Sequence, residues 1–206
     1  MIKPLQHPRR FLSSPPASLL VLFLAGCASR GGTVNLNSAD RKTVLSQSFA
    51  QAYITQGRGG EYDIILVDNA TEWNYQSPRK NRPLDPVTLD PVRQMMHIHL
   101  YWRPLAGTTR NPAAVNASFN WYVLGPEGST DVLAYEGAGY VAIRGSGAQR
   151  KIIIRDGQLK ARSSRGNLHD PIGPASISGR ATARVNETRA REILYEIQQE
   201  ANLAQP

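Results

Sequence analysis

The sequence predicts a mainly β protein, an antiparallel β-sandwich or a partly open barrel, with one C-terminal α-helix. Two patterns lead to this prediction. Short segments that alternate apolar and polar residues recur along residues 41–185, and glycine or proline separates most of them. An apolar stripe at helical spacing follows only in residues 187–203. About nine strands with frequent turns and one terminal helix are typical of a sandwich or a barrel.

Residues 1–26 have the features of an export signal. Lys3, Arg9 and Arg10 form a basic start, and no acidic residue occurs before Asp40. Residues 17–25 form an apolar run that is too short to span a bilayer core, which needs about 20 residues. We therefore predict that residues 1–26 are a signal peptide and are removed on export.

The export signal ends in Leu24-Ala25-Gly26-Cys27, and Cys27 is the only cysteine of the chain. This motif resembles the lipobox of bacterial lipoproteins, which the type II signal peptidase cuts. The resemblance implies that Cys27 becomes the mature N-terminus and carries covalent lipid, which anchors the protein in a membrane. Ala28 follows, not the aspartate of inner-membrane lipoproteins, so in a bacterium with two membranes we expect the outer membrane, facing the periplasm. An ordinary secretory signal is the alternative.

The mature chain would have 180 residues, which suits a single domain with its own core. Residues 27–40 are small and polar without apolar periodicity, so we predict a flexible tether there. Residues 41–206 then form one β-rich domain. With a single cysteine, this domain has no intramolecular disulfide and must hold together by burial and hydrogen bonding.

The first elements of the domain are a hairpin and a loop. Residues 48–56 fit a helix or a strand, but the glycine-rich residues 57–60 and the β-rich run at residues 62–67 favour a hairpin. Residues 77–91 hold four prolines, which lack the amide proton of a β-ladder. We predict a long loop there and treat it as a candidate contact surface.

Residues 95–103 form the clearest predicted strand. Its two faces would carry Met96, Ile98, Leu100 and Trp102 on one side, and Met95, His97, His99 and Tyr101 on the other. Residues 117–124, 131–136 and 140–144 are further predicted strands. Gly137-Ala138-Gly139 is predicted as a turn between the last two.

Asp156-Gly157 predicts a two-residue hairpin turn, since a type I′ turn needs positive φ at both positions. The resulting register would pair Ile154 with Leu159 and Ile152 with Ala161, so that all four share one apolar face. Pattern and turn agree, which makes this the best-determined hairpin in the sequence.

The chain closes with a loop, a strand and a helix. Residues 163–175 hold two prolines and are predicted to be a loop, and residues 176–185 alternate as a last strand. A helix at about residues 187–203 follows. Its apolar stripe consists of Ala190, Ile193, Leu194, Ile197 and Ala201. Such a stripe usually packs on the body of its own domain, and a partner-binding role is the alternative.

The charge points to an anionic partner. The chain carries a formal charge of +8, and basic residues gather in residues 144–184. Arg155, Lys160 and Arg162 would lie on the basic face of the predicted hairpin, and we take them as candidates for binding an anionic lipid or an envelope protein. A solvated strand face is the alternative. Nucleic acid is not an expected partner, because export separates the protein from it.

Three histidines are candidate metal ligands. His97 and His99 lie two residues apart, so a strand would point both imidazoles from one face. His169 could add a third ligand from a loop, with Asp170 beside it. We expect a lipid-anchored, non-enzymatic binding or structural module without a cofactor other than the covalent lipid. The alternatives are a periplasmic hydrolase assisted by a metal at these histidines and a lipid carrier.

Overall fold

The computed structural model describes residues 31–38, 40, 43–71, 75–76, 92–104, 114–126 and 129–203. The lipobox with Cys27 and the predicted loop at residues 77–91 lie outside these residues. The elements are β1 (Gly32–Ser38), β2 (Thr43–Phe49), β3 (Gln51–Gln56), the 3₁₀ helix η1 (Arg58–Gly60), β4 (Tyr62–Thr71), β5 (Tyr75–Gln76), β6 (Val92–Leu100), β7 (Ala117–Leu124), β8 (Val132–Arg144), β9 (Gln149–Arg165), β10 (Ala175–Val185) and α1 (Glu187–Leu203).

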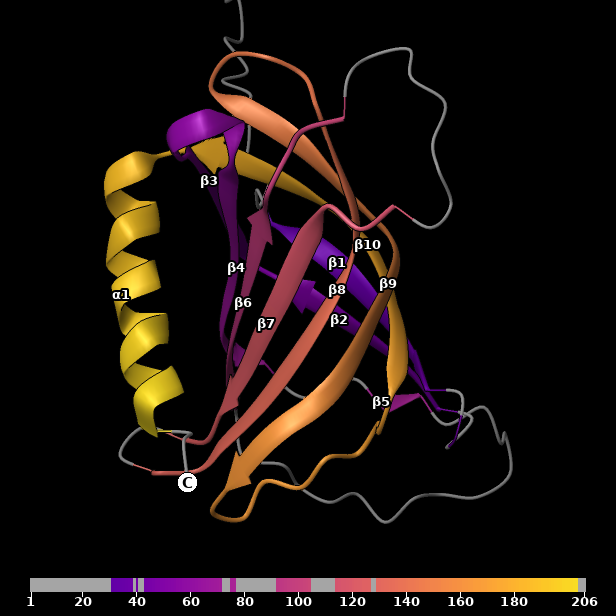
Figure 1. The fold of residues 1–206 in the computed structure, drawn as a ribbon. Helices are drawn as coiled ribbons and strands as arrows, with labels where there is room; N and C mark the ends of the chain where they lie inside the picture. The colour runs from indigo at the N-terminus through magenta and orange to yellow at the C-terminus, as the bar shows by residue number, and fades with distance from the viewer. Residues whose placement is uncertain are drawn as a thin grey trace, which may run out of the picture.

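Seven strands close into a barrel in the order β3-β4-β6-β7-β8-β9-β10 (Figure 1). A short parallel contact between β10 and β3 completes the ring, whereas the other neighbours in it are antiparallel. Along the rest of its edge β10 pairs with β1, which continues into β2 and β5. The prediction of a mainly β chain is therefore confirmed, and of its two architectures the barrel is right and the sandwich wrong.

Apolar side chains fill the barrel interior. Met96, Ile98 and Leu100 point inward from β6 and are fully buried, as the alternation predicted. Trp121 of β7 stacks on Tyr135 of β8 with ring centroids 5.0 Å apart, and both rings are buried. Trp102 was expected on the same face as Met96 but lies past the end of β6, where it is 46% exposed.

Helix α1 packs on the outer wall of the barrel over β3 and β4 (Figure 1). Ala190, Ile193 and Ile197 of its stripe are buried against outward-facing apolar residues. These residues are Ile65, Val67, Met95, Tyr122, Leu124, Val132 and Ala134. The strands beneath α1 are therefore apolar on both faces, which explains continuous runs such as residues 64–67. The stripe packs on its own domain, and the predicted helix at residues 187–203 is confirmed.

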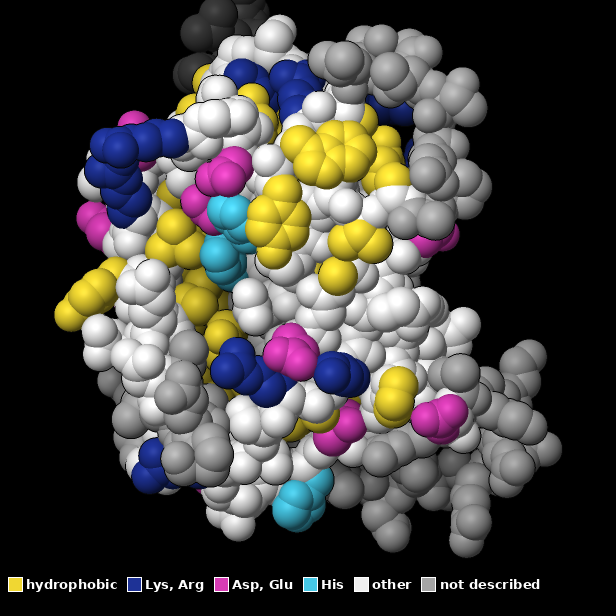
Figure 2. Space-filling view, viewed as in Figure 1, with side chains coloured by type: hydrophobic (Ala, Val, Ile, Leu, Met, Phe, Trp, Pro, Cys, Tyr) yellow, Lys and Arg dark blue, Asp and Glu magenta, His cyan; other side chains and the backbone are white. Residues whose placement is uncertain are grey.

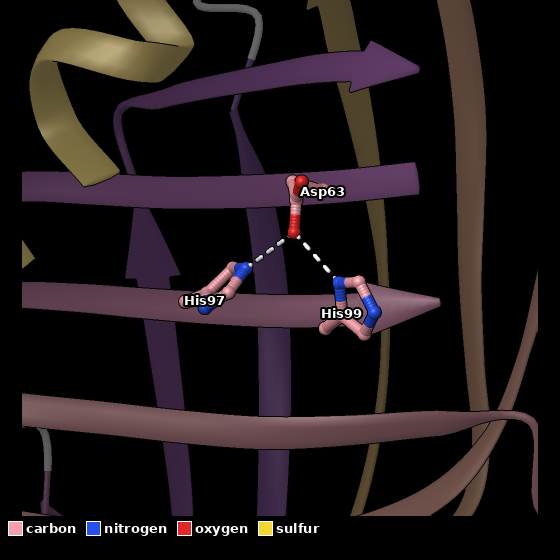
Figure 3. A group of neighbouring side chains, drawn as sticks. All are labelled: Asp63, His97 and His99. Carbon is pink, nitrogen blue, oxygen red and sulfur yellow. Dashed lines mark hydrogen bonds and ion pairs between the residues drawn. The ribbon is translucent and has the colours of Figure 1, made fainter. Parts of the chain in front are cut away.

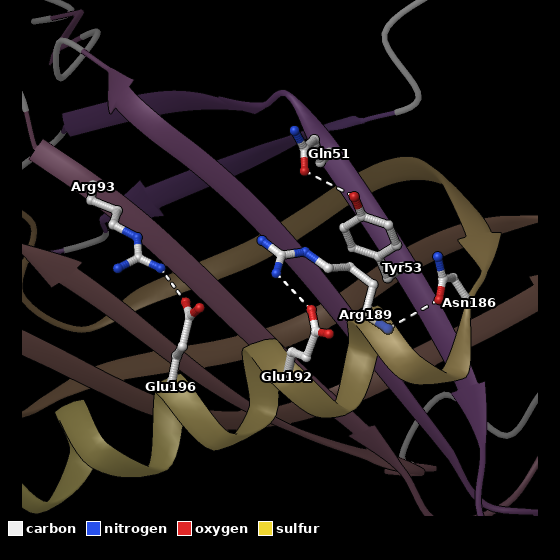
Figure 4. A network of polar contacts seen from close by, with 7 residues as sticks. All are labelled: Gln51, Tyr53, Arg93, Asn186, Arg189, Glu192 and Glu196. Atoms are coloured by element: carbon white, nitrogen blue, oxygen red, sulfur yellow. Dashed lines mark hydrogen bonds and ion pairs between the residues drawn. The ribbon is translucent and has the colours of Figure 1, made fainter.

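Polar contacts hold α1 at its N-terminus and at its middle (Figure 4). The backbone N–H of Arg189 donates to Oδ1 of Asn186 at 3.0 Å, so Asn186 caps the helix. Arg93 of β6 forms an ion pair with Glu196 in the middle of the helix. Within the part of the chain that the structure describes, no helix combines the length and the apolar character that crossing a bilayer requires.

The N-terminal region differs from its prediction. We expected residues 27–40 to be a flexible tether, but residues 32–38 form strand β1 between β2 and β10. Val34 and Leu36 of β1 are buried in the main core. The sequence did not predict this strand because only two of its side chains are strongly apolar, and the others, such as Gly32 and Asn35, are small or polar. The hairpin predicted from residues 48–56 and 62–67 is confirmed, since β3 and β4 form an antiparallel pair.

The predicted hairpin at Asp156-Gly157 is wrong, because β9 runs straight through these residues. Asp156 has φ +49° and lies where the pairing of β9 with β8 shifts register, so the dipeptide forms a β-bulge. Ile154 pairs with Val141 and Gly179 instead of Leu159. A bulge and a hairpin turn both use the left-handed conformation, and the neighbouring strands select the bulge.

The two strands predicted at residues 131–136 and 140–144 are in fact one strand, β8. The sequence predicted a turn at Gly137-Ala138-Gly139, but β8 continues through all three residues. A Cβ on Gly137 would lie 1.8 Å from the carbonyl oxygen of Gln158, and a Cβ on Gly139 would lie 2.4 Å from Cα of Gly157. These glycines allow β8 and β9 to approach closely beside the bulge. The turn predicted at these residues is therefore wrong.

Candidate functional site: a histidine and aspartate cluster

His97 and His99 lie on the outer face of β6, opposite to the inward-facing Met96 and Ile98. Their spacing of two residues places both imidazoles on one side, as predicted. The neighbouring strand β4 places Asp63 directly opposite His99 and Ile65 opposite His97. The pairing of β4 with β6 therefore brings a carboxylate next to both rings.

The three side chains converge on one oxygen atom (Figure 3). Oδ1 of Asp63 lies 2.8 Å from Nε2 of His97 and 2.8 Å from Nδ1 of His99. One ligand atom from each residue lies within 4.8 Å of the other two. This arrangement can hold a divalent cation, and without a cation it is a carboxylate hydrogen-bonded to two imidazoles.

The cluster is half-buried, with side-chain exposures of 23% for Asp63, 18% for His97 and 28% for His99. Burial alone raises the pKa of the Asp63 carboxyl, but the hydrogen bonds and charges of the two imidazoles outweigh burial. The net pKa of Asp63 is therefore lowered, and the group is a carboxylate near neutral pH.

Aromatic side chains border the cluster on its solvent side. The ring of Tyr101 meets His99 edge to face with centroids 4.9 Å apart. Tyr101 is 50% exposed, and Trp102 next to it is also exposed. Figure 2 shows two histidine side chains beside hydrophobic side chains on this face of the barrel, with acidic side chains adjoining them. A ligand at the cluster would thus contact aromatic surface as well as polar atoms.

His169 does not join the cluster, although the sequence suggested it as a third ligand. It is exposed in the connection between β9 and β10. Its neighbour Asp170 has a structural role instead: its Oδ1 accepts hydrogen bonds from the Tyr135 hydroxyl at 2.8 Å and from the backbone N–H groups of Ile172 and Gly173. The carboxylate that completes the histidine pair is Asp63, which sequence reasoning did not select.

The predicted basic residues separate into two places on the barrel wall. Lys160 and Arg162 lie beside Glu136 of β8, with N···O distances of 3.4 and 3.9 Å. Figure 2 shows basic and acidic side chains mixed on the lower half of its face. Arg155 lies on the other side of the bulge, where it lines an open hollow of about 430 Å³ with Arg180.

The hollow belongs to a larger basic surface on β8, β9 and β10, which we call the basic wall. Arg144 pairs with Lys151 across β8 and β9, and Arg184 lies at the end of β10. The members of the basic wall are Arg144, Lys151, Arg155, Arg180 and Arg184. All five side chains are exposed, and none takes part in the ion pairs found within the described residues.

No protein-family model, curated protein or solved structure matches this chain.

Proposed function

We propose that this chain is a lipid-anchored cell-envelope protein whose barrel is a non-enzymatic binding module held against an anionic membrane surface. Cys27 carries the lipid, and in a bacterium with two membranes the protein lies on the outer membrane, facing the periplasm. The observation that carries the proposal is the short distance along the chain between Cys27 and the barrel, because β1 begins at Gly32.

Gly32 is the fifth residue after Cys27, and a fully extended chain over these five steps spans at most about 18 Å. The barrel must then stay close to the bilayer surface to which the lipid is attached. Gly32 pairs with Ala181 of β10, and the N–H of Thr182 donates to the carbonyl oxygen of Gly31 at 3.0 Å. The chain therefore enters the barrel beside the strand that carries Arg180 and Arg184.

The basic wall is the surface of suitable charge at this position. Its cations are exposed, and each basic side chain near an anionic leaflet contributes about 1 kcal/mol of attraction. The hollow adds hydroxyl and amide groups from Thr33, Asn35 and Ser178 beside Arg155 and Arg180. Guanidinium and hydroxyl donors of this kind suit the phosphate of a lipid headgroup.

The anchor is tested by mass spectrometry of the protein isolated from bacterial membranes. We expect a chain that starts at Cys27 and carries fatty acids there. A Cys27→Ala variant should lack this mass and should not be cut at the same site. A wild-type chain that begins at another residue, or that has no acyl group, would remove the basis of the proposal.

The membrane contact is tested with the lipidated protein in vesicles of phosphatidylcholine, alone or mixed with phosphatidylglycerol. Backbone hydrogen exchange of residues 144–151 should be slower on the anionic vesicles. Arg144→Gln/Lys151→Gln should lose this difference. The control variant Lys160→Gln/Arg162→Gln removes the same amount of charge outside the basic wall. It should keep the difference in exchange between the two kinds of vesicle. Equal exchange on both kinds of vesicle would instead favour an envelope protein as the partner, to be identified by crosslinking.

The sequence leaves two other functions as alternatives, a metal-assisted hydrolase and a lipid carrier. A metal-assisted periplasmic hydrolase would use the cluster of Asp63, His97 and His99, whose chemistry is considered below. A lipid carrier would need an apolar cavity in the barrel. In the described part of the barrel that space holds packed side chains such as Phe119 and Trp121, so we do not propose a carrier.

A further inference from the structure

We propose that Asp63, His97 and His99 bind one divalent transition-metal ion, such as zinc, on the outer wall of the barrel. The cluster lies on β4 and β6, away from the strands that form the basic wall. The metal site is therefore independent of lipid anchoring and of membrane contact. The proposed function can fail while the metal site holds, and the reverse.

The donor set selects the class of ion. Imidazole nitrogens bind zinc, copper, nickel and iron well, whereas calcium and magnesium prefer oxygen ligands only. Two imidazoles and one carboxylate are a common set for zinc and for iron(II). Two of the three donors here are imidazoles. A transition metal is therefore favoured over an alkaline-earth ion.

The geometry is close to that of a bound ion. A tetrahedral ion with bonds of about 2.0–2.1 Å separates its ligand atoms by about 3.3 Å. The carboxylate oxygen lies 2.8 Å from each ring nitrogen, and all three ligand atoms lie within 4.8 Å of one another. Small side-chain rotations would open the two short contacts and place an ion between the atoms that now share hydrogen bonds.

The backbone beneath the cluster is rigid, which lowers the cost of forming the site. His97 and His99 lie on a strand that is paired on both sides, with β4 and with β7. The intervening side chain, Ile98, is fully buried in the core. Sites on paired strands keep their ligands in place better than sites on loops.

The exposed side of the cluster leaves room for a further ligand. Three protein ligands leave at least one coordination position of a tetrahedral ion open, as in catalytic zinc sites. The three side chains retain between 18 and 28% of their exposure, and Tyr101 adjoins His99 at the surface. The open position would take water or an oxygen atom of an anionic ligand, next to an aromatic surface.

The test is calorimetric titration of zinc chloride into the full chain, purified in detergent without a histidine tag and stripped with a chelator. We expect one ion per chain for the wild type and for the control variant His169→Ala, which removes an exposed histidine outside the cluster. His97→Ala and His99→Ala should each weaken binding by at least about 100-fold, because loss of an outer-shell partner alone costs 10- to 100-fold. Cys27 is unchanged in all variants, so its contribution cancels.

A second measurement covers variants that fold poorly. Cobalt(II) bound to the wild type should give the intense visible absorption of a tetrahedral site, and this band should be absent from the conservative variant His97→Gln. Melting curves in chelator should show that His97→Gln is folded. Zinc binding that His97→Ala, His99→Ala and Asp63→Asn leave unchanged, or that His169→Ala weakens equally, would overturn the proposal. So would a dissociation constant above about 0.1 mM for the wild type.

Discussion

The side-chain amide of Asn116 pairs with the backbone of Val141 in both directions. Nδ2 of Asn116 donates to the Val141 carbonyl oxygen at 2.9 Å, and the Val141 N–H donates to Oδ1 at 2.8 Å. Nδ2 also donates to the carbonyl oxygen of Trp102 at 3.2 Å. Asn116 is fully buried just before β7 begins, so its side chain continues the ladder with β8 beyond the end of the strand.

Asn116→Ala should destabilise the protein by about 2–4 kcal/mol, because it leaves the buried N–H and carbonyl of Val141 without this partner. The loss should appear as a lower midpoint in urea with an unchanged slope. Asn167→Ala, at an exposed asparagine, is the control and should shift the free energy of unfolding by less than about 0.5 kcal/mol. A small effect at both positions would contradict this account of Asn116.

Gly157→Ala should destabilise the barrel by about 1–3 kcal/mol or more, because a Cβ there would overpack the core. That atom would lie 2.5 Å from Cγ2 of Ile177 and 2.7 Å from Cε2 of the Phe119 ring. Gly57→Ala is the matched control, since its nearest contact is an ordinary 3.5 Å and its φ of −82° suits alanine. Thermal unfolding of both variants measures the difference, and equal melting temperatures would mean that Gly157 has no packing role.

Ile193→Ala should cost about 2–5 kcal/mol, because the side chain is 1% exposed between α1 and the barrel wall. Tyr195→Ala, on the outward face of the same helix, should cost little, since Tyr195 is 64% exposed. Urea denaturation followed by circular dichroism compares the two variants. If Tyr195→Ala proved the more damaging, α1 would have to pack through its other face.

Tyr122 should make stability fall at alkaline pH. It lies under α1, where burial raises the pKa of its hydroxyl, partly offset by the charge of Arg162. Because the pKa of Tyr122 is raised in the folded state, its contribution to stability is fully present below the ordinary tyrosine pKa of about 10. This contribution is lost as the pH rises through the pKa of the folded state. The slope contributed by one such group reaches about 1.4 kcal/mol per pH unit.

Tyr122→Phe removes this contribution. The free energy of unfolding, measured in urea between pH 9 and 11.5, should therefore fall less steeply in the variant than in the wild type. Tyr195→Phe, at an exposed tyrosine, should leave the slope unchanged. Parallel profiles for wild type and Tyr122→Phe would show that the Tyr122 hydroxyl titrates in the same way in both states.

Local periodicity was enough to predict most of the secondary structure. The alternation in residues 95–100 correctly separated the inward-facing Met96 from the outward-facing His97, and the helical stripe correctly located α1. Pairing between distant segments was not accessible in this way. Asp63 lies 34 residues from His97 along the chain, and only the register of β4 against β6 brings them together.

Glycine was misread for a related reason. At Gly137, Gly139 and Gly157 the sequence shows a turn-forming residue, and a local reading assigns a turn. In the fold these glycines face neighbouring backbone or the Phe119 ring, at distances that no side chain tolerates. This crowding arises only when three strands pack together, so the sequence of a single strand cannot predict it.

Strand β1 also determines how the domain would resist mechanical force. If Cys27 is fixed in a bilayer, tension on the domain reaches it through Gly32, and a force directed along β1 would pull this strand against both of its neighbours. That strand is paired over its seven residues with β10 on one side and with β2 on the other. Both ladders would then be loaded in shear, so that many hydrogen bonds must break together instead of one after another. A strand paired on both sides in this way would resist being pulled out of the sheet better than an edge strand.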